Sequence, residues 1–339
     1  MASSSSKTKV AIVGGDSLLA RELRDLLDEH KPVPEIELIS AAPEGTSMLS
    51  AELNPATEEA LIMSPLVKGT LDGTGVVFLA GTASSSRRAA KLRPEDSVLI
   101  DLAAGLEDLP EARLRAPSAE APGQSEPGAA GTSVQVIAHP GAIALTMFLS
   151  RLSALAKIER SIVHVFEPAS ERGQKGIEEL QKQTVAILSF KPVEGDVFDT
   201  QLAFNLLAAY GEEALEPMES IELRLERHLA SLLAGWPSIP MPSLRLIQAP
   251  VFHGHSMSIW VEFAERPDLE ELAKSLEEAG LDVRAEEPPA NAAVAGNSGL
   301  SVGAITPDRN HATGCWFWLV NDNIRLAAEN AIAVREELL

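Results

Sequence analysis

Cysteine, aromatic residues and long apolar runs are all scarce in this chain. Its 339 residues include one cysteine, Cys315, and 4% aromatic residues. A single cysteine cannot form an intrachain disulfide and offers a metal at most one thiolate, so we expect a reducing compartment and no metal site. No run reaches the roughly 18 uncharged apolar residues of a membrane span, and no secretory signal precedes the first strand pattern. We therefore expect a cytoplasmic protein without a membrane partner.

Basic residues are also few relative to acidic ones. The chain has 28 Lys and Arg against 49 Asp and Glu, a formal net charge of −21. Because the acidic residues are spread along the chain and no basic run interrupts them, the long-range field repels nucleic acid. We expect no nucleic-acid partner, and phosphate ligands are disfavoured unless a local site overrides the field.

The chain contains two successive regions that differ in their pattern of strands and helices, and its length favours two domains. From Lys9, short buried-strand patterns alternate with helical stretches, which is typical of an α/β domain with a parallel sheet. After Pro140, longer helical patterns alternate with strands, which indicates an α+β domain. The stretch 116–133 is rich in Pro, Gly, Ala and Ser and predicts a surface loop. The strand patterns of the first part are KVAIVGG, EIELIS, GVVFLAG, SVLIDLA and VQVIAHP.

Several segments, taken in order, carry a resemblance to a known family. They are residues 10–27, AHPGAIAL (138–145), ERGQKGIEEL (171–180), AFNLLAAYGE (203–212), APVFHGHSMSIWVEF (249–263) and NDNIRLAAENA (321–331). These segments resemble aspartate-semialdehyde dehydrogenase and the wider semialdehyde dehydrogenase family, whose reaction belongs to amino-acid biosynthesis. The resemblance covers nearly the whole chain, and the GHS and DN-x-R motifs are its most specific parts.

The resemblance implies a domain organisation and an assembly. It implies a Rossmann-like NAD(P)-binding domain over residues 8–139, completed by a last helix over 323–339. It implies an α+β dimerisation domain over 140–322. Because the family dimerises through this middle domain, we expect a homodimer.

The nucleophile position is where the chain first departs from the family. The family's cysteine, which attacks the aldehyde, lies in an Asn-Pro-x-Cys motif that corresponds here to His139, Pro140, Gly141 and Ala142. A methyl group therefore stands where the resemblance implies the thiolate that this covalent chemistry needs. Cys315 lies in the apolar strand pattern GCWFWLV, and we expect an inert core thiol there.

The family's catalytic histidine has a counterpart in this chain. His255 matches it, and without a cysteine partner we interpret His255 as a vestigial, satisfied structural group. His253 receives no role from the resemblance. Among the substrate contacts, Glu167 stands where the family has a glutamine, and Gln248 stands where it has the arginine that holds the substrate carboxylate.

These substitutions all change charge in the same direction. A gained carboxylate and a lost guanidinium both disfavour an anionic substrate. Glu107 and Glu222 correspond to the two cations of the family's phosphate site, so two positive charges have become negative. Like charges at contact distance repel strongly, which predicts the loss of phosphate affinity.

The cofactor turn has changed as well. The family's G-x-x-G-x-x-G corresponds to Gly14, Ser17 and Ala20, so only the tight-turn glycine remains. Asn323, at the start of the last helix, matches a cofactor contact, but we prefer a role for it in capping and pinning that helix. We expect no bound cofactor; NADP or NAD is the alternative.

Three functions remain open from the residues alone. The first, which we favour, is a catalytically inactive pseudoenzyme that serves as a dimeric scaffold or as the regulatory partner of another protein. The second is an NAD(P)-dependent oxidoreductase that acts on a different aldehyde without a cysteine nucleophile and uses His255 as an acid. The third is a small-molecule sensor that uses the old substrate cleft.

Overall fold

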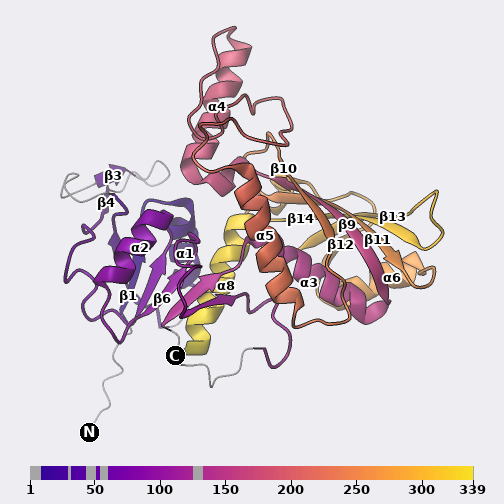
Figure 1. Cartoon of the computed structure of the whole chain (residues 1–339), viewed down its shortest axis with the longest axis horizontal. Coiled ribbons are helices and arrows are strands. Elements are labelled where there is room, and N and C mark those ends of the chain that lie inside the picture. The colour runs from indigo at the N-terminus through magenta and orange to yellow at the C-terminus, as the bar shows by residue number, and fades with distance from the viewer. Residues whose placement is uncertain (1–8, 30–31, 43–50, 54–59, 125–132, 339) are drawn as a thin grey trace. The chain divides into compact units, whose positions relative to one another are not determined.

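The computed structural model describes residues 9–29, 32–42, 51–53, 60–124 and 133–338 (Figure 1). The chain divides into two compact units. The first runs to Pro117 and adds Pro122–Ala138 and Ala327–Leu339, and the second consists of Ser118–Ala121 and His139–Leu326. Among the described residues, no helix combines the length and the apolarity that crossing a membrane requires. The predicted loop lies partly outside the described residues.

The first unit is built on a parallel sheet with the strand order β2-β1-β5-β6-β8-β7. Helix α1 connects β1 to β2, and α2 connects β5 to β6, which is the Rossmann-like alternation that the sequence predicts. A two-stranded antiparallel sheet, β3 with β4, is inserted after β2. The elements are β1 (Lys9–Val13), α1 (Leu18–Asp28), β2 (Glu35–Ile39), β3 (Ala51–Leu53), β4 (Ala60–Ile62), β5 (Val76–Leu79), α2 (Ala83–Leu92), β6 (Val98–Asp101), β7 (Ala112–Arg115) and β8 (Val134–Ile137).

The second unit is built on a mixed sheet with the strand order β10-β9-β11-β14-β13-β12. The long strands β9, β11 and β14 pair antiparallel at its centre, whereas β10 pairs parallel with β9. The strands are β9 (Ile158–Glu167), β10 (Ser243–Gln248), β11 (His255–Phe263), β12 (Asp282–Arg284), β13 (Ser301–Pro307) and β14 (Gly314–Asn321). The helices are α3 (Pro140–Leu155), the 3₁₀ turn η2 (Ala169–Arg172), α4 (Gly173–Leu188), α5 (Met218–Leu233), α6 (Leu269–Glu278) and α7 (Asn291–Val294). The last helix, α8 (Asn323–Leu338), begins in the second unit, and its residues from Ala327 onward belong to the first.

Helix α3 is buried on nearly all sides. Its apolar residues do not form a single stripe, and such a helix belongs inside a domain. It packs against α5 and α6, and Phe148 meets Phe317 of β14 edge to face with 5.2 Å between ring centroids. This packing holds the start of α3, at His139, in a defined place. The fold class predicted from the sequence is confirmed for both units.

Helix α4 and the irregular segment after it extend away from the second unit's sheet (Figure 1). They have a small core of their own, which includes Leu180, Phe198 and Leu202. Several large apolar side chains of the same region are exposed: Val185, Leu188, Phe190, Phe204, Leu206 and Leu215. We call this region, residues 173–216, the arm.

Candidate functional site

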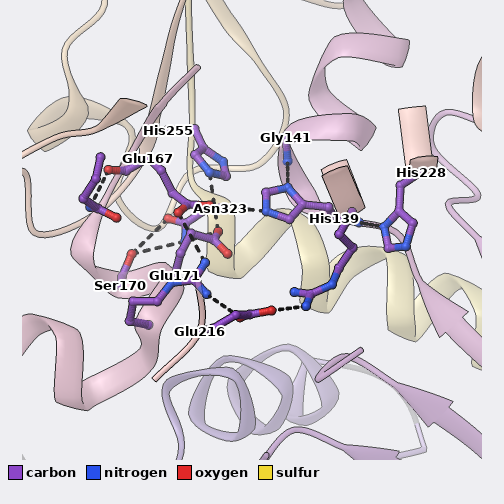
Figure 2. A network of polar contacts seen from close by, with 12 residues as sticks. His139, Gly141, Glu167, Ser170, Glu171, Glu216, His228, His255 and Asn323 are labelled. Carbon is purple, nitrogen blue, oxygen red and sulfur yellow. Dashed lines mark hydrogen bonds and ion pairs between the residues drawn. The ribbon is translucent and has the colours of Figure 1, made fainter. Parts of the chain in front are cut away.

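A buried group of polar side chains lies in the second unit, where four segments meet (Figure 2). His139 precedes α3, Glu167 ends β9, Glu171 lies in η2 and His255 begins β11. Their side chains are 6%, 0%, 11% and 0% exposed, respectively. We call these four residues the His–Glu cluster.

The register of the sheet explains why two members of the cluster meet. Strands β9 and β11 are antiparallel neighbours, and Phe166 pairs with Ser256. The end of one strand therefore lies beside the start of the other, which brings Glu167 and His255 to the same edge of the sheet. The turn η2 follows β9 after Pro168 and adds Glu171 at this edge.

Glu167 is ionised although it is fully buried. Its Oε2 lies 3.3 Å from Nη2 of Arg172, and its Oε1 lies 3.4 Å from Nε2 of His139. Burial opposes ionisation, but the Arg172 guanidinium and His139 outweigh it and lower the pKa of Glu167 to about 2. Glu167 therefore carries a charge that the protein itself compensates.

Arg172 changes the interpretation of the site's charge. Its Nη1 lies 3.1 Å from Oε2 of Glu216, which also pairs with Arg224. Burial disfavours the charged guanidinium, but Glu167 and the other surrounding groups raise the pKa of Arg172 above its ordinary value. Glu167, expected from the sequence to be an uncompensated negative charge, lies beside the arginine five residues later. The structure corrects this, because the two charges form a buried pair.

His255 is not the satisfied structural group that the sequence analysis expected. It is completely buried, and neither of its ring nitrogens has a hydrogen-bond partner among the described residues. Its Nε2 lies 3.6 Å from Oε1 of Glu171, beyond hydrogen-bonding distance. Burial lowers the pKa of His255 despite the nearby Glu171 carboxylate, so the neutral imidazole is favoured. The ring is therefore buried beside a carboxylate without being held by a hydrogen bond of the described residues.

His139 is a member of the site that the sequence analysis did not single out. Its Nδ1 accepts a hydrogen bond from the Gly141 N–H at 3.1 Å and so caps α3. Its own backbone N–H donates to Nδ1 of His228 at 2.9 Å. Because Nδ1 is an acceptor, the ring proton lies on Nε2, which has no hydrogen-bond partner among the described residues. The only signal for this in the sequence is a histidine directly before the proline that starts a helix.

Gln248 has all its side-chain atoms engaged by the chain. Its Nε2 donates to the backbone oxygens of Glu167 and Ala249, at 2.8 and 3.2 Å. Its Oε1 accepts from the hydroxyl of Tyr210 at 2.5 Å. Burial, together with the Glu167 charge, raises the pKa of Tyr210 above its ordinary value, so the hydroxyl remains a donor. Gln248 thus ties β10 to β9.

Ala142 and Cys315, the two residues on which the expected loss of the nucleophile depends, are both buried. Ala142 is completely buried in the first turn of α3. Cys315 is buried in β14, and burial raises the pKa of its thiol to about 11. Cys315 pairs with Val261, six positions along β11 from His255. At roughly 3.3 Å per residue this separates the thiol from His255 by about 20 Å.

Asn323 does not cap the last helix, contrary to the preferred expectation. The cap is Asp322, whose Oδ1 accepts from the Arg325 N–H at 2.9 Å. Asn323 instead joins the site, because its Nδ2 donates to Oε1 of Glu171 at 2.7 Å and its Oδ1 accepts from the Gly254 N–H at 3.1 Å. Asn323 therefore holds Glu171 of the His–Glu cluster in place.

Two further polar side chains have structural partners. His253 lies with its Nε2 at 2.9 Å from Oδ2 of Asp322. Glu222, on α5, accepts from Arg245 at 3.1 Å and from the Leu246 N–H at 2.7 Å. Glu222 therefore anchors β10 to α5. Glu107, the other position expected from the family's phosphate site, lies in the first unit, whereas Glu222 lies in the second.

The candidate cofactor turn lies in the first unit, between β1 and α1. Gly14 has a positive φ of 88°, and a Cβ there would lie 2.4 Å from Cα of Gly81. The N–H groups of Gly14 and Gly15 both donate to the Ile39 oxygen. Ser17 caps α1, because its Oγ accepts from the Ala20 N–H at 3.0 Å. The glycine is thus required by chain packing, and three of the turn's N–H groups are already bonded.

The order of the two units has its counterpart in known proteins. Residues 9–118 match the NAD-binding domain of semialdehyde dehydrogenase, and residues 149–326 match the semialdehyde dehydrogenase dimerisation domain. The chain therefore belongs to the semialdehyde dehydrogenase family, as its motifs predict.

Individual relatives match over nearly the full length. The USG-1 protein homolog of Pseudomonas aeruginosa is 29% identical over 338 residues, which is 97% of each chain. The aspartate-semialdehyde dehydrogenase of Aquifex aeolicus is 28% identical over 347 residues, which is 98% of each chain. Among solved structures, a probable aspartate-semialdehyde dehydrogenase from Pseudomonas aeruginosa has a TM-score of 0.83 at 28% identity and covers 97% of this chain and 98% of its own.

Proposed function

We propose that this protein is a catalytically inactive, cytoplasmic member of its family that acts as a dimeric scaffold or as a regulatory partner of another protein. One observation carries the proposal: the chain's only thiol is buried about 20 Å along the sheet from His255. A thiolate must lie within hydrogen-bonding reach of its base to begin the family's reaction. With Ala142 at the nucleophile position, that reach is missing.

The substrate contacts support the same conclusion. Gln248 bonds to Tyr210 and to two backbone oxygens, so its amide holds the strand ends rather than a substrate carboxylate. Arg172, a guanidinium close to the cluster, is held between Glu167 and Glu216. An anionic substrate would have to compete with the buried Glu167 and the partly exposed Glu216 for this cation.

The cofactor turn does not fit a pyrophosphate well. Phosphate groups bind the free N–H groups at the start of a helix, and the Ala20 N–H is bonded to Ser17. The exposed Asp16 places a negative charge in the same turn. We infer that neither NADP nor NAD is bound tightly, and no step of the function depends on them.

The exposed apolar side chains of the arm support homodimer formation. They include Phe190, which is 99% exposed, and Leu206, which is 63% exposed. Apolar groups gathered on one region of a soluble protein mark an association surface. A second copy of the chain is the partner that the dimerisation domain implies. Light scattering of the full chain should give a dimer, and Leu206→Asp should weaken it.

An activity assay tests the proposal directly. The full chain, purified from a host without its own enzyme, is incubated with aspartate semialdehyde, NADP and phosphate while NADPH formation is followed. We expect no turnover, and we expect none from Ala142→Cys, since the substrate contacts are also changed. Turnover by the unaltered chain that His255→Ala abolishes would establish the cysteine-free oxidoreductase instead. Turnover by Ala142→Cys alone would contradict the altered substrate contacts.

A further inference from the structure

We propose that the His–Glu cluster binds one divalent transition-metal ion of the zinc type through His139, Glu167, Glu171 and His255. The proposal goes beyond an inactive scaffold, because it assigns a ligand to the second unit. Its test measures metal binding and not turnover, so the two proposals can fail separately.

The donor set has the right chemistry. Imidazole nitrogens and carboxylate oxygens are the usual zinc ligands besides thiolates, and two of each occur here. The two carboxylates supply oxygen ligands, and Oε1 of Glu167 is the oxygen that does not face Arg172. The expectation of no metal rested on the single cysteine, and this group of ligands contains none.

The separations between donor atoms are suitable. The donor atoms of His139, Glu167 and Glu171 all lie within 4.8 Å of one another. Nε2 of His139 lies 3.4 Å from Oε1 of Glu167, and Nε2 of His255 lies 3.6 Å from Oε1 of Glu171. Bonds of about 2.0–2.2 Å to a tetrahedral ion separate its ligands by about 3.3–3.6 Å. Both contacts match edges of such a tetrahedron. His255 lies outside the group of three whose donor atoms are mutually within 4.8 Å, so its ring would have to move toward the ion as the fourth ligand.

Unpartnered atoms inside the cluster provide an independent argument. Nε2 of His139, Oε1 of Glu167 and both ring nitrogens of His255 lack hydrogen-bond partners among the described residues. Buried polar atoms are normally paired, so this concentration in one place requires an explanation. An ion at the centre would engage three of these four atoms at once.

The surrounding groups hold the carboxylates in place. Oε2 of Glu167 faces Arg172, which leaves Oε1 directed at the cluster. Oε1 of Glu171 accepts from Asn323 at 2.7 Å. Outer partners of this kind orient metal ligands and tune their affinity. Glu171, the most exposed of the four side chains, marks the side from which an ion would enter.

One hydrogen bond has to change when the ion binds. In the metal-free protein the Gly141 N–H donates to Nδ1 of His139, so Nε2 carries the proton. Coordination through Nε2 moves this proton to Nδ1 and breaks the bond to Gly141. The ¹⁵N resonances of His139 should therefore report an exchange of tautomer on addition of zinc.

The test is a calorimetric titration of the chelator-treated full chain with zinc chloride. We expect one zinc per chain. The variant His255→Phe keeps a ring but loses the donor, and it should weaken binding at least about 100-fold, since even outer partners of metal ligands contribute 10–100-fold. Glu171→Gln should also weaken it. The matched control is His253→Gln, two residues away and outside the ligand set, which should bind as the unaltered chain does.

Substitution with cobalt provides a second readout. A tetrahedral site of nitrogen and oxygen ligands should give the intense visible absorption of four-coordinate Co²⁺, and His255→Phe should abolish it. Circular dichroism first verifies that each variant is folded. Absence of stoichiometric zinc binding would overturn the proposal. So would equal zinc affinity of His255→Phe and the unaltered chain, because the ion would then be bound elsewhere on the acidic surface.

Discussion

The turn after β1 and the His–Glu cluster are the two places where the family's function would reside, and they differ in their hydrogen bonding. In the turn, Gly14, Gly15 and Ser17 exchange bonds with the chain itself. In the cluster, His139, Glu167 and His255 keep unpartnered atoms. Because the polar groups of the turn bond to the chain itself, the turn is stable without a ligand. A site whose buried groups remain unpartnered costs stability, and this cost is sustained where a ligand offsets it.

The largest loss of stability is expected from a variant that removes the positive charge beside Glu167. Arg172→Met leaves Glu167 buried without its cation and should lower the free energy of unfolding by about 3–5 kcal/mol. Urea denaturation followed by circular dichroism measures this. The double variant Glu167→Gln/Arg172→Met is the control and should recover part of the loss. Equal losses in the single and double variants would show that the pair is not coupled.

The next effect tests whether the turn is kept for packing. Gly14→Ala should lower the free energy of unfolding by at least about 2 kcal/mol, because of the positive φ and the contact with Gly81. Gly73→Ala is the matched control: φ there is also positive, at 74°, but the space around it is open. The control should lose only about 1 kcal/mol. Similar losses in thermal unfolding of the two variants would remove the packing argument.

The third effect tests the cost of unpartnered atoms in the cluster. In metal-free protein, His255→Phe removes two buried nitrogens without breaking a hydrogen bond of the described residues. It should raise the free energy of unfolding by about 1 kcal/mol. The comparison is His139→Phe, which breaks the cap of α3 and should be destabilising. Clear destabilisation by His255→Phe in urea denaturation would mean that His255 has a structural partner.

The smallest effect concerns a buried group outside both sites. The pKa of Cys315 is raised to about 11, so as pH rises the unfolded chain loses the thiol proton before the folded chain does. Stability is therefore lost above the ordinary thiol pKa, by about 0.5 kcal/mol at pH 9. Cys315→Ala should lack this decrease between pH 7 and pH 9. Matching pH profiles for the two proteins would show that the thiol is not perturbed.

Element patterns could be read from the sequence where one periodicity dominated. The strands of the first sheet were predicted, except β7, whose sequence ARLR mixes basic and apolar residues because it lies at an edge. Helix α5 was not identified. Its buried Met218, Ile221, Leu225 and Leu229 do follow the spacing of a helical face, so a signal was present.

The candidate site was predicted less completely. His255 and Glu167 were named from the resemblance, but their partners were not. Glu171 and Arg172 begin the family segment 171–180, but the resemblance gave them no role, and they lie in a short 3₁₀ turn. His139 gained its role only from its place before α3. Residue type indicates which groups can titrate or bind, but pairing depends on distances between segments far apart in the sequence.

The sequence by itself determined the fold class, the family and the presence of alanine at the position implied for the nucleophile, because periodicity and ordered motifs are local properties of the chain. Only the tertiary structure decided that Glu167 is neutralised by Arg172, that Asp322 rather than Asn323 caps α8, and that His255 is left without a hydrogen bond. Each of these depends on which groups the sheet and its neighbouring turns bring within a few ångströms. Electrostatic and hydrogen-bond energies fall steeply over that distance.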